Sequence, residues 1–152
     1  VDDLTAADVP FLAKPFARGH IADWSTCDWY CVKVLARVLE RAPDAPEAAE
    51  AIAAWRSAPV LWQRRAAAVS FVTLAPHGNG RLPNLTKLVL EVCAVNVRDA
   101  ERFSQTSVGW VLRELSRADP NAVAAFVEEH AEEMSAEARR MAMAKIRGRG
   151  RR

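Results

Sequence analysis

The feature that most constrains this chain is its helical periodicity. Apolar residues recur at steps of three and four along nearly the whole sequence. The alternation of apolar and polar residues that marks a half-buried strand is nearly absent. Ala, Leu, Glu and Arg, which are all good helix formers, are abundant. The sequence therefore predicts an all-α fold.

Proline, glycine and capping residues divide the helical pattern into segments. Asp44, Asp99, Asp119 and Ser135 each precede a periodic stretch and are expected to cap a helix, and Pro76–Gly80 reads as a loop. The expected helices span roughly residues 6–18, 27–42, 46–57, 59–75, 82–96, 100–117, 120–132 and 135–147.

The spacing of these helices suggests how they are arranged. Successive helices alternate with short connections at about 40 residues per pair, which is typical of HEAT-like repeats. We expect an all-α, HEAT-like repeat solenoid of stacked antiparallel helix pairs, with a plain helical bundle as the alternative. Residues 1–146 would form a single domain, and residues 147–152 a flexible basic tail.

Composition restricts the class of protein. Hydrophobic residues make up 51% and charged residues 26%, as in globular chains. No apolar run approaches the roughly 20 residues that span a bilayer, so we expect no membrane. The formal net charge is +2, and without the four Arg of residues 147–152 it is −2. A broad electrostatic field for nucleic acid is therefore excluded, and any DNA site must be a local patch.

The cysteines favour a reduced compartment. Cys27, Cys31 and Cys93 form an odd set, and no secretory signal opens the sequence, so we expect free thiols and a cytoplasmic protein. Cys27 and Cys31 lie one helical turn apart, but no Cys or His pattern completes a set of metal ligands. We interpret them as small buried residues and expect no metal.

Three segments carry residues suited to chemistry. In the helix expected at 100–117, one face holds an apolar stripe and another mixes aromatic and cationic residues: Phe103, Thr106, Trp110, Arg113 and Arg117. Such a face often marks a ligand surface. The alternative is that Trp110 fills a gap against the next repeat.

The second segment places Trp24 and Asp28 four residues apart, and therefore on one helix face. A carboxylate beside an indole is unusual for a core. The alternative is that Asp28 or Ser25 caps a helix while Trp24 and Trp29 pack around it.

The third segment is Leu61–Ala67, in which Arg64 and Arg65 stand early in an Ala-rich helix. The forked donors of Arg suit phosphate. The alternative is a salt-bridged pair on the surface.

Together these segments resemble the DNA alkylation repair family, the AlkD-like alkylpurine DNA glycosylases. The motifs that carry the resemblance are Trp24-x-x-x-Asp28, Leu61–Ala67 and Val108–Glu114, in this order, and the resemblance extends from about residue 20 to residue 146. It implies catalytic roles for Trp24, Asp28 and Trp110, and DNA contact by Arg65.

Other positions extend or depart from the family pattern. Arg64 and Arg113 are further candidates for phosphate, although Arg113 beside Glu114 could instead tie neighbouring helices together. Thr106 stands at a DNA-contact position where the family frequently has Lys, and Ser25 replaces a common acidic residue. Family members also carry several more helices before the Trp-Asp motif.

The implied activity is excision of cationic N3- or N7-alkylated purines from duplex DNA without classical base flipping. Breaking the glycosidic bond builds positive charge on the deoxyribose, which a carboxylate stabilises. Aromatic faces add cation–π attraction of roughly 0.5–2 kcal/mol each. No metal or organic cofactor is required, and we expect a monomer.

Two other functions remain open from the sequence. One is a noncatalytic relative that binds DNA by its backbone shape. The other is a protein-binding helical scaffold, which the acidic residues Glu128, Glu129, Glu132 and Glu133 would suit.

Overall fold

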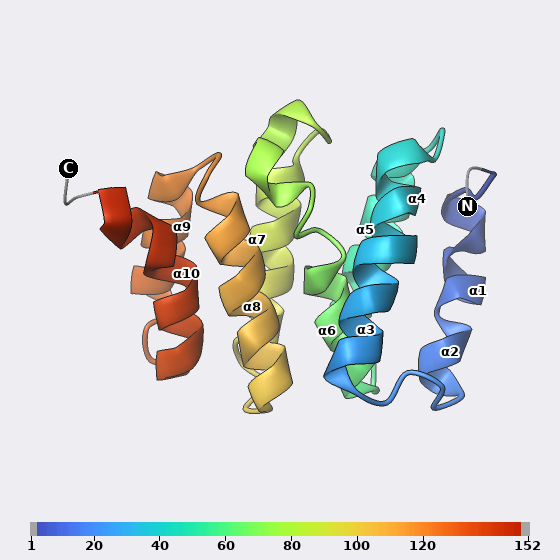
Figure 1. Cartoon of the computed structure of the whole chain (residues 1–152), viewed down its shortest axis with the longest axis horizontal. Coiled ribbons are helices and arrows are strands. Elements are labelled where there is room, and N and C mark those ends of the chain that lie inside the picture. The colour runs from blue at the N-terminus through green and yellow to red at the C-terminus, as the bar shows by residue number, and fades with distance from the viewer. Residues whose placement is uncertain (1–2, 150–152) are drawn as a thin grey trace.

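The computed structural model describes residues 3–149, which form helices stacked in a row (Figure 1). No strand occurs among these residues. The α-helices are α1 (Val9–Leu12), α2 (Lys14–Ala17), α3 (Trp24–Tyr30), α4 (Ala36–Arg41), α5 (Ala45–Ala53), α6 (Leu61–Val69), α7 (Leu85–Asn96), α8 (Arg102–Leu115), α9 (Pro120–Glu129) and α10 (Ala136–Arg149).

The helices after α2 form two layers. Helices α3 and α4 lie end to end beside α6, α8 and α10, all five run in the same direction, and we call them the front layer. Helices α5, α7 and α9 lie behind them and run the opposite way (Figure 1). The prediction of an all-α stack of antiparallel helix pairs is therefore confirmed.

Helices α3 and α4 form one continuous rod. A wider π-helical turn, Cys31–Leu35, joins them, so the chain stays helical from Trp24 to Arg41. This α3–α4 rod begins three residues earlier than the sequence predicts, and its N-cap is Asp23.

Asp23 accounts for the early start of α3. Its carboxylate accepts hydrogen bonds from the Thr26 amide (2.9 Å), the Thr26 hydroxyl (2.7 Å) and the Ser25 hydroxyl (2.6 Å). These bonds, led by the one from Ser25, lower the pKa of Asp23 to about 2. The alternative that Asp28 or Ser25 caps the helix is therefore wrong, and Asp28 is free for another role.

Of the four predicted N-caps, two make the expected capping hydrogen bond and two do not. Asp119 accepts a bond from the Ala122 amide, and Ser135 accepts one from the Ala138 amide, as expected. Asp44 stands at the N-cap of α5 but makes no capping bond, because its carboxylate accepts instead from the distant Ala6 amide at 2.9 Å. Asp99 is not the cap of α8, since the helix begins two residues later with Glu101 at its N-cap.

The core lies between the two layers. Cys27, Cys31 and Cys93 are fully buried free thiols, which confirms their interpretation as small core residues. Burial raises the pKa of Cys31 and Cys93. Among the described residues, no group of His, Cys, Asp or Glu is arranged to hold a metal ion.

A buried polar side chain on α8 binds the loops that precede α8 and α10. Gln105 is 4% exposed, and its amide nitrogen donates to the carbonyls of Val97, Asp99 and Glu133 while its oxygen accepts from the Ser135 amide. Buried amides are stable only when they are satisfied in this way. Gln105 therefore fixes the loops before α8 and α10.

Helices α8 and α10 pack closely at Gly109. A Cβ atom there would lie 2.9 Å from the Ala138 carbonyl oxygen, 2.9 Å from the Met141 Cβ and 3.0 Å from the Ala138 Cα. Two of these atoms belong to the α10 backbone, which cannot swing aside. The glycine before Trp110 is therefore a packing requirement.

One carboxylate joins the same two helices by charge. Glu114 of α8 accepts from Lys145 of α10 at 2.9 Å and from Arg113 at 3.1 Å, and Arg117 lies 3.7 Å away. Burial acts to raise the pKa of Glu114, but the hydrogen bonds from Lys145 and Arg113 outweigh it and hold the pKa below its ordinary value of 4.5.

The described helices include none long and apolar enough to cross a membrane. Helix α10 extends to Arg149, into the stretch expected to be a basic tail, and residues 150–152 of that tail lie outside the described residues.

We predict that Gly109→Val lowers the free energy of unfolding by roughly 2–3 kcal/mol, because overpacking against rigid backbone is costly. Chemical denaturation measures it. Gly80→Ala is the matched control: Gly80 is exposed and nothing lies within 4 Å of its added Cβ, so its effect stays within about 0.5 kcal/mol. Equal stabilities of the two variants would contradict the close packing.

We predict that Glu114→Gln destabilises the protein near neutral pH by about 2–3 kcal/mol, because it removes charge-assisted hydrogen bonds. A folded-state pKa below 4.5 means that this stabilisation is present above that pH and is lost as the pH falls through the folded pKa. The stability difference between wild type and variant should therefore shrink on acidification, as measured by thermal melts over a pH series. A constant difference would argue against the ion pairs.

Candidate active site

The centre of the candidate site is a bidentate ion pair. Asp28 on α3 accepts from the guanidinium of Arg65 on α6, with Arg65 Nε 2.7 Å from Oδ1 and Nη2 2.9 Å from Oδ2. The Arg65 side chain is 6% exposed and that of Asp28 is 15% exposed. The buried cation therefore holds the carboxylate, which remains partly exposed to solvent.

The same guanidinium reaches a third helix. Arg65 Nη1 donates to the Phe103 carbonyl at 2.8 Å and to the Thr106 hydroxyl at 3.0 Å, both on α8. These four hydrogen bonds leave one of the five N–H groups of the guanidinium for any other acceptor. Arg65 thus joins α3, α6 and α8 in the middle of the front layer.

An aromatic pair lies on the α8 side of the Arg65 guanidinium. The Phe103 and Trp62 rings contact at 5.2 Å between centroids, and the Arg65 guanidinium lies 5.8 Å from the centre of the Phe103 ring. Rings in these positions exclude water from the cation and limit its rotamers. They explain why Arg65 is buried although it belongs to an exposed-looking Arg-Arg pair.

The two predicted catalytic tryptophans lie on different helices, Trp24 one turn from Asp28 and Trp110 one turn from Thr106. Trp24 precedes Asp28 by four residues on α3, and the residue is 54% exposed. Trp110 follows Thr106 by four residues on α8 and is half-buried against the core. The fold therefore gives the carboxylate one indole on its own helix and places the other a turn beyond the Arg65 contact on α8.

The other predicted DNA contacts are engaged within the protein. Arg64 donates to Asp99 at 3.0 Å and to two carbonyls of the loop before α6. Arg113 pairs with Glu114, in agreement with the helix-tying alternative. Thr106 is 8% exposed and accepts from Arg65, so its hydroxyl faces inward.

Sequence reasoning missed the partnership of Asp28 with Arg65. Both residues were singled out, but they are 37 positions apart, and no local spacing relates them. A signal that pointed toward it was the charge itself: an Arg within an Ala-rich, buried helix requires an anion.

Chemically, the arrangement presents a fixed negative charge at a protein surface. Each Asp28 oxygen uses one lone pair on Arg65 and keeps another for a water or a hydroxyl. The hydrogen bonds hold the carboxylate in one orientation, so it needs no reorganisation when a positive charge develops nearby. Such a site suits a reaction with a cationic transition state.

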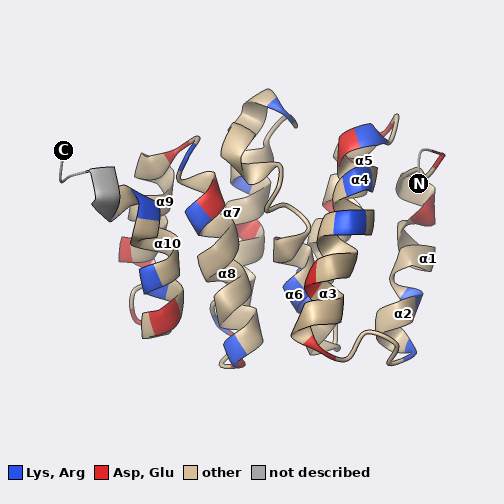
Figure 2. Ribbon diagram, viewed as in Figure 1, with Lys and Arg blue, Asp and Glu red and all other residues tan. Residues whose placement is uncertain are grey.

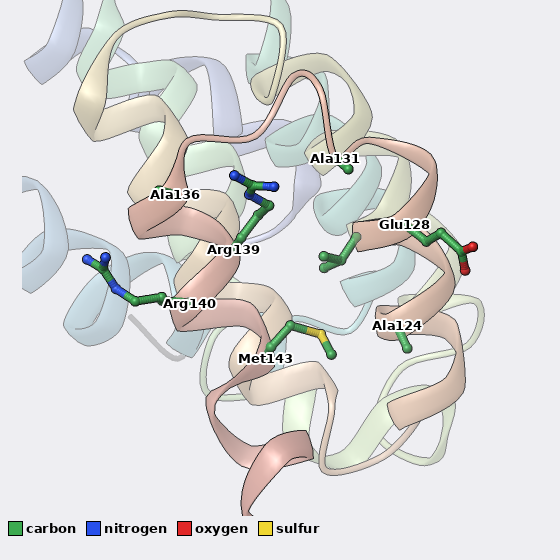
Figure 3. A pocket seen from close by; sticks show the side chains of 8 residues that line it. Ala124, Glu128, Ala131, Ala136, Arg139, Arg140 and Met143 are labelled. Atoms are coloured by element: carbon green, nitrogen blue, oxygen red, sulfur yellow. The ribbon is translucent and has the colours of Figure 1, made fainter.

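Two grooves lie away from the candidate site. One of about 460 Å³ runs between α9 and α10, where small residues such as Ala124 and Ala136 leave a shallow depression (Figure 3). Arg140 and Glu128 point to opposite sides of it. Another, between α7 and α9, is lined by Phe126 and His130. Neither groove is lined by a residue of the candidate site.

Comparison with curated protein sequences finds no match to this chain. The family described as DNA alkylation repair enzyme, in contrast, matches residues 2–146, which include the whole α3, α6 and α8 arrangement. Because the match covers nearly the entire length, the chain belongs to the DNA alkylation repair enzyme family.

Proposed function

We propose that this protein is a DNA glycosylase that excises cationic N3- or N7-alkylated purines from duplex DNA. The observation that carries the proposal is the Asp28 carboxylate, fixed by two hydrogen bonds from Arg65 and open to solvent on one edge. Membership of the DNA alkylation repair enzyme family supports a substrate in DNA.

The chemistry needs a fixed anion more than a proton donor. An alkylated purine already carries positive charge and leaves readily, so the difficult step is the build-up of charge on the deoxyribose as the glycosidic bond breaks. Asp28 stabilises that charge and orients the water that attacks the sugar. No metal or cofactor takes part in this sequence of steps.

The tryptophans supply a second attraction for the same charge. The exposed face of Trp24 lies one turn from Asp28 on the same side of α3. Cation–π contact with the developing sugar cation contributes roughly 0.5–2 kcal/mol per ring. Trp110 would act from α8 on the other side of the lesion. In this proposal the base remains in the helical stack.

In this proposal Arg65 is a positioning residue. Its guanidinium fixes the Asp28 carboxylate through two donors, and its contacts to Phe103 and Thr106 fix the guanidinium in turn. A phosphate role is confined to the one remaining N–H group.

A noncatalytic DNA-binding role is the second candidate. The observation that favours it is the same ion pair, because the Arg65 charge offsets part of the Asp28 charge that a developing sugar cation would meet. A folded protein that binds the duplex and releases no base would support this role.

We predict that the wild type releases base from duplex DNA containing one 7-methylguanine and that Asp28→Asn reduces the single-turnover rate at least tenfold, because it removes the charge and keeps the shape. Base release at saturating protein measures it. Glu91→Gln, which removes an exposed carboxylate from the opposite layer, should retain the wild-type rate. Equal rates for Asp28→Asn and wild type would remove Asp28 from the mechanism.

We predict that Arg65→Lys also lowers the rate about tenfold or more while affinity for undamaged duplex stays within about twofold. Lysine keeps the charge but cannot form the bidentate bond that orients Asp28. If Arg65 acted only on phosphate, lysine, itself a good phosphate ligand, would preserve most of the rate. The two measurements together separate positioning from DNA binding.

A further inference from the structure

The cations near the candidate site are mostly neutralised within the protein. Every Lys and Arg on α6 and α8 forms an ion pair with a carboxylate, through Arg64, Arg65, Arg102 and Arg113. A paired cation binds phosphate less strongly, because it must share or break its ion pair within the protein to do so. The cations that can meet DNA at this face must therefore come from elsewhere.

The α3–α4 rod carries such cations. Lys33 and Arg37 are exposed. Among the described residues, the side chain of neither forms an ion pair or a hydrogen bond. One turn before Lys33, Trp29 has 61% of its surface exposed, which is more than Trp24. An exposed indole beside two unpaired cations is an unusual use of surface unless something binds there.

The π-helical turn brings these three residues into line. In an α-helix of about 3.6 residues per turn, each step of four overshoots a full turn by roughly 40°, so residues at steps of four drift around the helix. The turn at Cys31–Leu35 is wider, and a step of four through it falls short of a full turn. The opposite drifts offset each other, and Trp29, Lys33 and Arg37 stay on one outward line.

This line lies in the same layer as the candidate site. Figure 2 shows Lys and Arg segments along the α3–α4 rod, which lies beside α6, the helix next to α8. At about 1.5 Å per residue, Lys33 and Arg37 lie roughly 8 and 14 Å beyond Asp28 along the rod. One DNA strand places a phosphate every 3.4 Å or so of its rise. A strand running along the rod would present phosphates to both cations within a few nucleotides of the lesion.

We propose that Trp29, Lys33 and Arg37 form a contact line for the sugar–phosphate backbone of one DNA strand beside the lesion. The inference rests on the proposed function in that it takes duplex DNA as the ligand. Lys33 and Arg37 bind two phosphates, and the Trp29 ring packs against a deoxyribose between them and the site. The contacts are with the backbone, so they carry no sequence preference.

The test is the salt dependence of binding to an undamaged duplex. The doubly substituted protein Lys33→Ala/Arg37→Ala should lose about 1.8 from the slope of log affinity against log salt, because each neutralised phosphate contributes about 0.9. Arg81→Ala/Lys87→Ala is the control: it removes the same charge from exposed positions in the turn before α7 and on α7, and should leave the slope unchanged. Trp29→Ala should weaken binding several-fold without changing the slope.

The outcomes separate this inference from the glycosylase proposal. A wild type that releases 7-methylguanine but shows the same salt slope as Lys33→Ala/Arg37→Ala overturns the contact line and leaves the activity standing. A wild type that releases no base but loses slope in that variant supports the contact line and overturns the activity. A wild type that does not bind the duplex, or equal slope losses in the variant and its control, also overturns the contact line.

Discussion

The Arg65 guanidinium is the constraint on which the front layer depends. It is buried, so it requires an anion and several acceptors, and it finds them on α3 and α8. The three helices that carry the candidate residues are thereby set relative to one another by one side chain. The orientation of Asp28 follows from the same contacts, so scaffold and site are not separate features.

Many charged side chains of this protein are neutralised by a partner within the fold. Asp28, Asp99, Glu114 and Glu137 each take up a cation of the front layer, which agrees with a body whose formal charge is slightly negative. Attraction of DNA by a general field is therefore weak. In the proposed function, recognition depends instead on a few exposed cations and rings beside the DNA backbone.

Much of the architecture could be predicted from the sequence, since periodicity and the caps at Asp119 and Ser135 depend on local physics. The cap at Asp23 was missed because Asp28 offered a competing interpretation of the same segment. The burial of Arg65 could not be predicted, because it results from Asp28, Phe103 and Thr106, which are distant in sequence. The π-helical turn at Cys31–Leu35 has no local signal either, so the alignment of Lys33 with Arg37 emerged only in three dimensions.

The close approach at Gly109 means that the two tryptophans of the front layer differ in how freely they can move. Helix α8 packs against the α10 backbone there, and Glu114 binds Lys145 of α10 about a turn later. Helix α8, which carries Trp110, therefore has little freedom to move. Trp24, in contrast, stands exposed at the first turn of α3. In the proposed function, lesions of different bulk would therefore be accommodated from one side only, by movement at the start of α3, while α8 would keep its position.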